Sequence, residues 1–166
     1  MSFSHSKYKQ DFKVYDKLKR PERYCGKIKE IHTRSSWEKF FILNFLDVHP
    51  SVIEWSSEDF HIPYRWQVDG RIHRYFPDFY VKVKNKHQEI EELIIEIKPF
   101  DQTKPPKTPK RVTKKHKERL AEYVKNTNKW EQAYKYTRLL CEKGRNIRFV
   151  VMTENELFPK QDKRNR

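Results

Sequence analysis

Three side chains in two short segments have the types and the spacing needed to hydrolyse a phosphodiester with a metal ion. Asp78 follows a proline in the first segment, and Glu96 and Lys98 are separated by one residue in the second. Carboxylates are hard oxygen ligands of the kind that Mg²⁺ prefers, and bound Mg²⁺ activates water and polarises a phosphate. A lysine ammonium can orient the attacking water. Asp78, Glu96 and Lys98 are therefore candidate catalytic residues, with the backbone carbonyl of Ile97 as a further candidate metal ligand.

Two β-strands must position these side chains. Residues 74–83 and 94–99 are rich in β-branched and aromatic residues, and the polar segment 84–89 between them suits a hairpin connection. If the hairpin pairs near its ends, Asp78 lies close to Glu96 across the two strands.

An ordinary surface pair is the competing interpretation, because a Glu and a Lys on one face of a strand are usually solvated. The second strand, however, has apolar residues on both faces: Leu93, Ile95 and Ile97 on one, Ile94 on the other. Such a strand is typical of the centre of a sheet, where charges are partly buried and pair or bind metal.

Composition points to a polyanionic partner. The chain has 166 residues, enough for one domain with a single core, and 37 Lys and Arg against 23 Asp and Glu give a net charge of +14. This balance favours DNA or RNA, and no long amphipathic basic helix argues for a membrane surface. Three glycines exclude a glycine-rich phosphate loop. Two cysteines form neither a metal cluster nor a disulfide framework, and Cys141 is expected in the core.

A single domain is expected over residues 32–158. Residues 1–31 are predicted to be a partly ordered basic arm, and residues 159–166 a disordered basic tail. No signal peptide or membrane-spanning segment is expected, which places the protein in a reducing cytosol.

Glu38 has two competing roles. Residues 35–38 have the Ser-X-X-Glu form of a capping box, which predicts a helix that ends before Pro50. As a capping residue, Glu38 would turn back onto the Ser35 amide; as a catalytic acid, it would face the metal site.

One interrupted or bent edge strand is predicted for residues 51–63, followed by a hairpin of residues 62–67 and 72–83 around an Asp-Gly turn at 68–71. His73 and Arg74 lie upstream of Asp78 on the second hairpin strand. They either contact phosphate or are simply outward-facing polar residues.

A basic, proline-rich loop is predicted for residues 101–113, because its prolines block helix and sheet. It leaves the candidate catalytic strand, so we expect its cations to bind DNA phosphates. The candidate DNA-binding residues of the loop and of the helix start after it are Lys104, Lys107, Lys110, Arg111, Lys114 and Lys115.

The C-terminal part is predicted as a helix over 114–142, a strand over 146–152 and a short helix from Thr153. The long helix is expected to break near residues 126–128, with Asn128 as an N-cap. The resulting fold class is α/β, with a mixed central sheet flanked by helices.

Four motifs together carry a family resemblance: residues 33–38, 62–65, 73–80 and 96–99. With these motifs the chain resembles, over roughly residues 28–157, the head-completion nucleases (head-closure proteins) of T-even-like tailed bacteriophages, which belong to the PD-(D/E)XK nuclease superfamily. It is more distantly similar to the endonuclease subunit of heteromeric transposases.

The resemblance implies a Mg²⁺-dependent DNA endonuclease, with Mn²⁺ as an alternative ion, that acts in virion assembly after DNA packaging. It implies Glu38 as a further metal ligand, double-stranded DNA as substrate and portal or neck proteins as partners. The implied location is the cytoplasm of the infected host, or the head–neck region of the virion. The alternatives are a non-catalytic head-closure protein on a nuclease fold and a transposase endonuclease subunit. A basic RNA-binding protein is disfavoured, because no RNA-binding motif is present.

Overall fold

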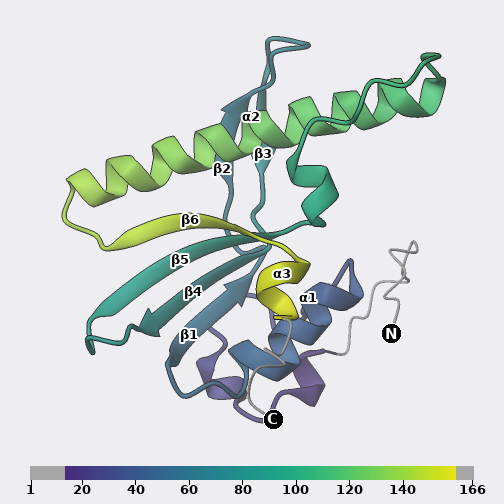
Figure 1. The fold of residues 1–166 in the computed structure, drawn as a ribbon. Helices are drawn as coiled ribbons and strands as arrows, with labels where there is room; N and C mark the ends of the chain where they lie inside the picture. Colours follow the sequence, from purple (N-terminus) through teal and green to yellow (C-terminus); the bar gives the residue numbers. More distant parts are fainter. Residues whose placement is uncertain (1–13, 160–166) are drawn as a thin grey trace.

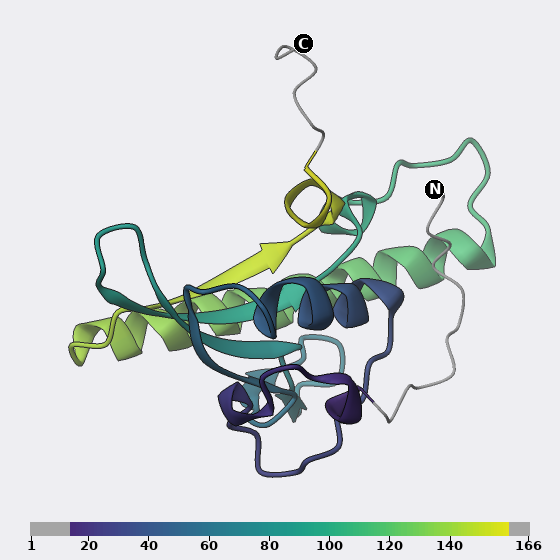
Figure 2. The same ribbon diagram turned by 90° about the horizontal axis from the view of Figure 1, so that it is seen from below.

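A computed structural model describes residues 14–159. Its centre is a four-stranded sheet in the order β1-β4-β5-β6, and a separate two-stranded sheet pairs β2 with β3. Helix α2 covers one face of the main sheet, and α1 and α3 lie on the other (Figures 1 and 2). The strands are β1 (Val52–Ser57), β2 (Ile62–Arg65), β3 (Ile72–Tyr75), β4 (Phe79–Lys84), β5 (Ile90–Ile97) and β6 (Ile147–Met152); the helices are α1 (Ser36–Phe41), α2 (Lys114–Glu142) and α3 (Glu154–Leu157). The predicted α/β class with a mixed, helix-flanked sheet is confirmed.

The main sheet is mixed because its connections differ in length. Strand β4 pairs antiparallel with both β1 and β5, whereas β6 returns through α2 and pairs parallel with β5. The β4–β5 connection is short and polar, and the Asn85 amide donates to the carbonyl of Glu89 at 2.9 Å. The predicted hairpin is confirmed.

Strand β5 has an apolar core on each of its faces, as predicted. Ile95 and Ile97 pack in a cluster with Phe41 of α1, whereas Ile94 packs with Trp130 of α2. Glu96 and Lys98, at the end of β5, therefore lie next to two packed apolar layers.

Two strand predictions were wrong in their boundaries. Residues 51–63 do not form one bent strand, because β1 lies at the edge of the main sheet and β2 belongs to the small sheet. Residues 72–83 are likewise divided into β3 and β4. Pro77 lies in the gap between them, and it has no N–H to continue a ladder. Glu58, between β1 and β2, has a positive φ of 46°, so the chain turns sharply there. The hairpin around Asp69-Gly70 is confirmed by the β2–β3 pairing.

Helix α1 is short and continues into a π-helical turn, η3 (Ile42–Leu46), so the helical segment ends before Pro50 as predicted. Its buried residues, Phe41, Ile42 and Leu46, pack under the sheet.

Helix α2 is continuous, and the predicted break near residues 126–128 is wrong. Thr113 is its N-cap, and Asn126 and Asn128 are buried in mid-helix. Asparagine is only a weak helix breaker, and packing against the sheet overrides that preference. The prediction that Cys141 belongs to the core is also wrong, because its side chain is exposed.

The N-terminal segment is part of the domain from Val14 onward, which corrects the predicted boundary of the basic arm. Val14, Tyr24 and Ile31 are buried in the core cluster, and Tyr24 forms a β-bridge with Trp55. The remainder of the arm (1–13) and nearly all of the predicted tail (160–166) lie outside the described residues. Among residues 14–159, no helix combines the length and apolar character needed to cross a bilayer.

Candidate active site

Asp78 and Glu96 meet where the β4–β5 ladder ends. The register pairs Phe79 with Ile95, and one further step along it brings Asp78 opposite Glu96. Oδ2 of Asp78 accepts a hydrogen bond of 2.7 Å from the backbone N–H of Ile97. The predicted proximity of the two carboxylates is therefore confirmed, and their catalytic roles remain predictions.

Glu96 is almost fully buried, at 4% exposure. Its Oε1 lies 3.2 Å from Nζ of Lys98, and its Oε2 accepts a hydrogen bond of 2.8 Å from the hydroxyl of Tyr75. Burial lowers the pKa of Lys98, but the charges of Glu96 and Asp78 outweigh it, so that the pKa is raised. Lys98 is therefore a cation at neutral pH, suited to holding an anion or a water rather than to removing a proton.

Glu38 caps its helix and also reaches the site. The Ser35 hydroxyl accepts from the Glu38 amide at 3.2 Å and donates to Oε1 of Glu38 at 2.9 Å. Oε2 accepts from the backbone N–H of Arg34 at 2.8 Å, one residue before the amide that a capping box would use. The Glu38 side chain also lines the same cavity as Asp78, so its two proposed roles are not exclusive.

A cavity of about 180 Å³ joins these side chains. Burial raises the pKa of Asp78 well above its usual range, and the neighbouring charges of Glu96 and Glu38 raise it further. Burial and the charge of Glu58 likewise raise the pKa of Glu38. The site therefore crowds carboxylates around one paired lysine, an arrangement that a bound cation would relieve. The cavity is lined by Arg34, Ser35, Trp37, Glu38, Glu58, Tyr75, Phe76, Asp78, Glu96, Ile97, Lys98 and Lys129.

The donor set fits Mg²⁺. Within residues 14–159 no cluster of three or more His, Cys, Asp or Glu side chains has the geometry of a metal site. Mg²⁺, however, is commonly held by one or two carboxylates, with water and substrate phosphate as its other ligands. Asp78 and Glu96 supply two hard oxygen donors, and their mutual repulsion is the observation that favours a divalent cation.

Tyr75 and Lys129 are site residues that the sequence did not predict. Lys129 comes from α2, outside every motif. Tyr75 lies in the 73–80 motif with Asp78, but it ends β3, which is separate from β4, and nothing in the sequence marked it as a partner of Glu96. Lys129 lies over the Tyr75 ring, with Nζ 5.5 Å from the centroid. Burial lowers the pKa of Lys129, and the positive charges of Lys98 and Lys125 act in the same direction. No ion pair with a carboxylate is found for Lys129 in the described part of the chain, so its charge is available to an anion.

The predicted DNA-binding residues lie outside this cavity. His73 lies 2.8 Å from Asp69 in the β2–β3 hairpin, and the ring of Trp66 packs against it. This arrangement supports the alternative of a structural polar residue for His73. Arg74, the next residue on β3, is exposed.

The basic loop residues are exposed between the 3₁₀ turn η4 (Phe100–Thr103) and α2 (Figure 1). Lys104 lies over the Phe100 ring, 4.2 Å from its centroid, and Lys114 pairs with Glu118 at 3.9 Å. Lys107, Lys110, Arg111 and Lys115 complete the exposed basic set.

The fold and the acid–acid–lysine arrangement define a class of protein, the PD-(D/E)XK-type nucleases. Comparison with known proteins gives the family. Residues 49–154 match the family model described as TnsA-like endonuclease N terminal. The chain is also 39% identical, over 139 residues, to the head completion nuclease of Enterobacteria phage T4, which covers 81% of this chain and 86% of that protein. None of the solved structures gives a significant match.

The chain belongs to this family of TnsA-like endonucleases and phage head completion nucleases. The matched range includes Asp78, Glu96 and Lys98, together with Tyr75 and Lys129, whereas Glu38 lies before it.

Proposed function

We propose that this protein is a Mg²⁺-dependent DNA endonuclease in which Asp78 and Glu96 hold the metal and Lys98 positions the attacking water. The observation that carries the proposal is the meeting of two carboxylates and one lysine at the end of the β4–β5 ladder, in a cavity with excess negative charge. Mn²⁺ is the alternative ion, and the Ile97 carbonyl is an additional candidate ligand.

A bound Mg²⁺ would lower the pKa of a coordinated water and neutralise charge on the phosphate. Tyr75 donates to Oε2 of Glu96 and fixes the orientation of that carboxylate. Lys98 presents its ammonium 3.2 Å from the other oxygen of Glu96, where it can orient a water for attack. Lys129 faces the same cavity without a carboxylate partner in the described chain, and we assign it to a phosphate oxygen.

DNA would approach through the basic loop. Lys104, Lys107, Lys110 and Arg111 lie on the segment that joins the catalytic strand to α2, where they can contact phosphates on either side of the scissile bond. The expected products carry a 5′-phosphate and a 3′-hydroxyl.

The name of the relative, head completion nuclease, supports a role at the same stage for this protein. We propose that this protein likewise acts on packaged double-stranded DNA at head completion, in contact with portal or neck proteins. It would then act in the cytoplasm of the infected host or within the head–neck region of the virion.

Nicking of supercoiled plasmid tests the proposal. The purified protein should convert plasmid to open circles with Mg²⁺ and leave it intact with EDTA. Asp78→Asn, purified in parallel, controls for a contaminating nuclease and should be inactive with Mg²⁺. An inactive wild-type protein that still binds DNA and restores completion of heads would favour the non-catalytic closure role instead.

A further inference from the structure

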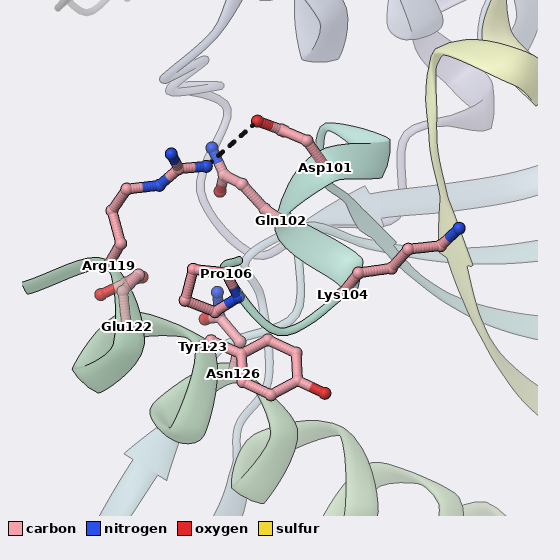
Figure 3. A pocket seen from close by; sticks show the side chains of 8 residues that line it. All are labelled: Asp101, Gln102, Lys104, Pro106, Arg119, Glu122, Tyr123 and Asn126. Atoms are coloured by element: carbon pink, nitrogen blue, oxygen red, sulfur yellow. Dashed lines mark hydrogen bonds and ion pairs between the residues drawn. The ribbon is translucent and has the colours of Figure 1, made fainter. Parts of the chain in front are cut away.

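A second cavity, of about 140 Å³, lies between η4 with the loop that follows it and the first half of α2. Figure 3 shows its lining: Tyr123 and Asn126 on α2 face the segment that carries Pro106, and Arg119 reaches toward Asp101. Gln102 also lines the cavity, and so does Lys104, whose side chain points away from the other lining residues (Figure 3). None of these residues lines the cavity of the candidate active site.

Asn126 is the unusual member of this lining. It is 1% exposed, and neither its Nδ2 nor its Oδ1 has a hydrogen-bond partner anywhere in residues 14–159. A buried amide with both ends unsatisfied is unfavourable for folding, and native proteins contain few of them. The lining of this cavity therefore includes a donor and an acceptor without partners in the described chain, both shielded from solvent, and a ligand that offers both groups would satisfy them.

The rest of the wall favours a flat heterocycle. Tyr123 supplies an aromatic face and Pro106 a flat apolar one. A cavity of roughly 150 Å³ holds a small flat aromatic molecule. Arg119 is held at 3.5 Å by Asp101, and the polar groups that can determine what binds include the amides of Gln102 and Asn126 and the carboxylate of Glu122. An asparagine amide matches the paired donor and acceptor on the edge of a nucleobase, adenine above all.

The cavity adjoins the candidate active site. Glu122 lines it and at the same time acts by its charge on the pKa of both Lys98 and Lys129. On α2, Asn126 and Lys129 are three residues apart, a separation of about 4.5 Å along the helix axis. The base of a nucleotide bound here would therefore lie next to a phosphate held by Lys129.

We propose that this cavity accepts one unpaired nucleobase of the DNA strand that is cut, with Asn126 bonding to the base edge and Tyr123 stacking on its face. The inference rests on the proposed function and specifies its substrate. A base paired within a duplex cannot enter, so the protein should prefer DNA in which a base near the cut is mismatched, frayed or single-stranded. The free energy needed to move a base out of the duplex is lowest when that base is already unpaired, as in enzymes that extrude a base.

Binding without cleavage provides the test. Anisotropy of labelled DNA is measured in EDTA with three duplexes of one sequence: fully paired, with one mismatched adenine, and with an abasic site in place of that adenine. Wild-type protein should bind the mismatched duplex about tenfold more tightly than the abasic one, within the range that one stacked base contributes. The abasic duplex is at least as flexible as the mismatched one, so tighter binding of the mismatched duplex reports the base itself.

Two buried asparagines of one helix give a matched pair of variants. Asn126→Leu should remove the preference for the mismatched adenine while keeping or raising the melting temperature, because it replaces an unsatisfied polar group with an apolar one of similar shape. Asn128 is also buried, at 7% exposure, but does not line the cavity, so Asn128→Leu should keep the preference. The proposal would be overturned if wild-type protein bound the mismatched and abasic duplexes with equal affinity. It would also be overturned if Asn126→Leu kept the preference for the mismatched adenine. Either result would mean that the cavity holds only solvent.

The test separates this inference from the proposed function. Asp78→Asn should lose plasmid nicking and retain the base preference. A protein that shows the base preference but never cleaves refutes the nuclease proposal alone, whereas a Mg²⁺-dependent nuclease without the preference refutes the base cavity alone.

Discussion

The β4–β5 ladder carries a glutamate system toward each of its ends, and the two differ in one respect. Glu96, which is buried at one end, and Glu92, which is partly buried two residues from the other, each accept a hydrogen bond from a tyrosine and pair with a cation. The partners are Tyr75 at 2.8 Å and Lys98 at 3.2 Å for Glu96, and Tyr80 at 2.7 Å and Arg145 at 2.8 Å for Glu92.

The difference lies in the charge balance. At Glu92 the guanidinium of Arg145 and the hydroxyl of Tyr80 lower the pKa of the carboxyl, so the anion is fully satisfied. At the other end Asp78 and Glu38 share the cavity with Glu96. Burial raises the pKa of both Asp78 and Glu38; the charges of Glu96 and Glu38 add to this effect for Asp78, and the charge of Glu58 adds to it for Glu38. The Glu92–Arg145 pair, in which the charges cancel, is therefore a structural ion pair. The Glu96–Lys98 pair, with further carboxylates beside it, belongs to a candidate metal site.

The largest expected effect comes from neutralising each glutamate in turn. Glu96→Gln should reduce Mg²⁺-dependent nicking by roughly a thousandfold, because it removes a metal ligand and charge at the site. Glu92→Gln, its counterpart on the same strand, should lose about 1 kcal/mol of stability and keep its activity. Initial nicking rates at saturating Mg²⁺ measure both. Comparable losses of activity in the two variants would contradict the assignment of function to one end.

Binding of DNA should also distinguish the two ends. Neutralising Lys107, Lys110 and Arg111 together should lower the slope of log K against log salt by roughly 2 to 3, since each phosphate contact contributes about 0.9. The control neutralises three exposed lysines near the other end of the ladder: Lys84, Lys86 and Lys143. That control should leave the slope unchanged. A slope that depends equally on both sets would mean that binding follows net charge, not the loop.

The pH dependence of stability should have opposite signs for Asp78 and Glu92. The raised pKa of Asp78 means that its ionisation opposes folding, and this penalty is present above the folded pKa and vanishes as the pH falls through the ordinary carboxyl range. In EDTA, Asp78→Asn should therefore melt roughly 3 °C higher than wild type at pH 8, with the gain lost near pH 3.

The lowered pKa of Glu92 predicts the reverse. Its stabilisation is present above the ordinary glutamate pKa and is lost as the pH falls through the folded value, so Glu92→Gln should melt lower at pH 8 and match wild type in acid. Thermal melts across this range provide the measurement. An Asp78→Asn variant that melts lower than wild type at pH 8 would show that its carboxylate is stabilising.

Local pattern was sufficient to predict the centre of the site but not its surroundings. The two-residue period of a strand and a short polar connection place Asp78 opposite Glu96, and both are visible in the sequence. Tyr75 was expected on the same strand as Asp78, but Pro77 divides that strand between two sheets. Lys129 lies on α2, and no local sequence pattern indicates that a helix residue lies beside the end of a strand that is distant in sequence.

The predicted break in α2 failed for a related reason. Asn126 and Asn128 are typical of turns, yet tertiary packing keeps them helical and buried. Of the two, only Asn126 lines the second cavity.

The smallest expected effect concerns Glu38, where capping and metal binding coincide. Glu38→Gln keeps the acceptor for the Arg34 amide, and the Ser35 hydroxyl can rotate to accept from the new amide group, so stability should change little. If the carboxylate helps to hold Mg²⁺, losing its charge should raise the Mg²⁺ concentration needed for half-maximal nicking several-fold, with the rate at saturation nearly unchanged.

Ser35→Ala is the complementary variant. It removes the N-cap oxygen, which should cost about 1 kcal/mol of stability, but leaves the negative charge at the cavity, so the Mg²⁺ requirement should stay near that of wild type. A Glu38→Gln protein with wild-type Mg²⁺ dependence would restrict Glu38 to its helix cap and leave Asp78 and Glu96 as the metal-binding carboxylates.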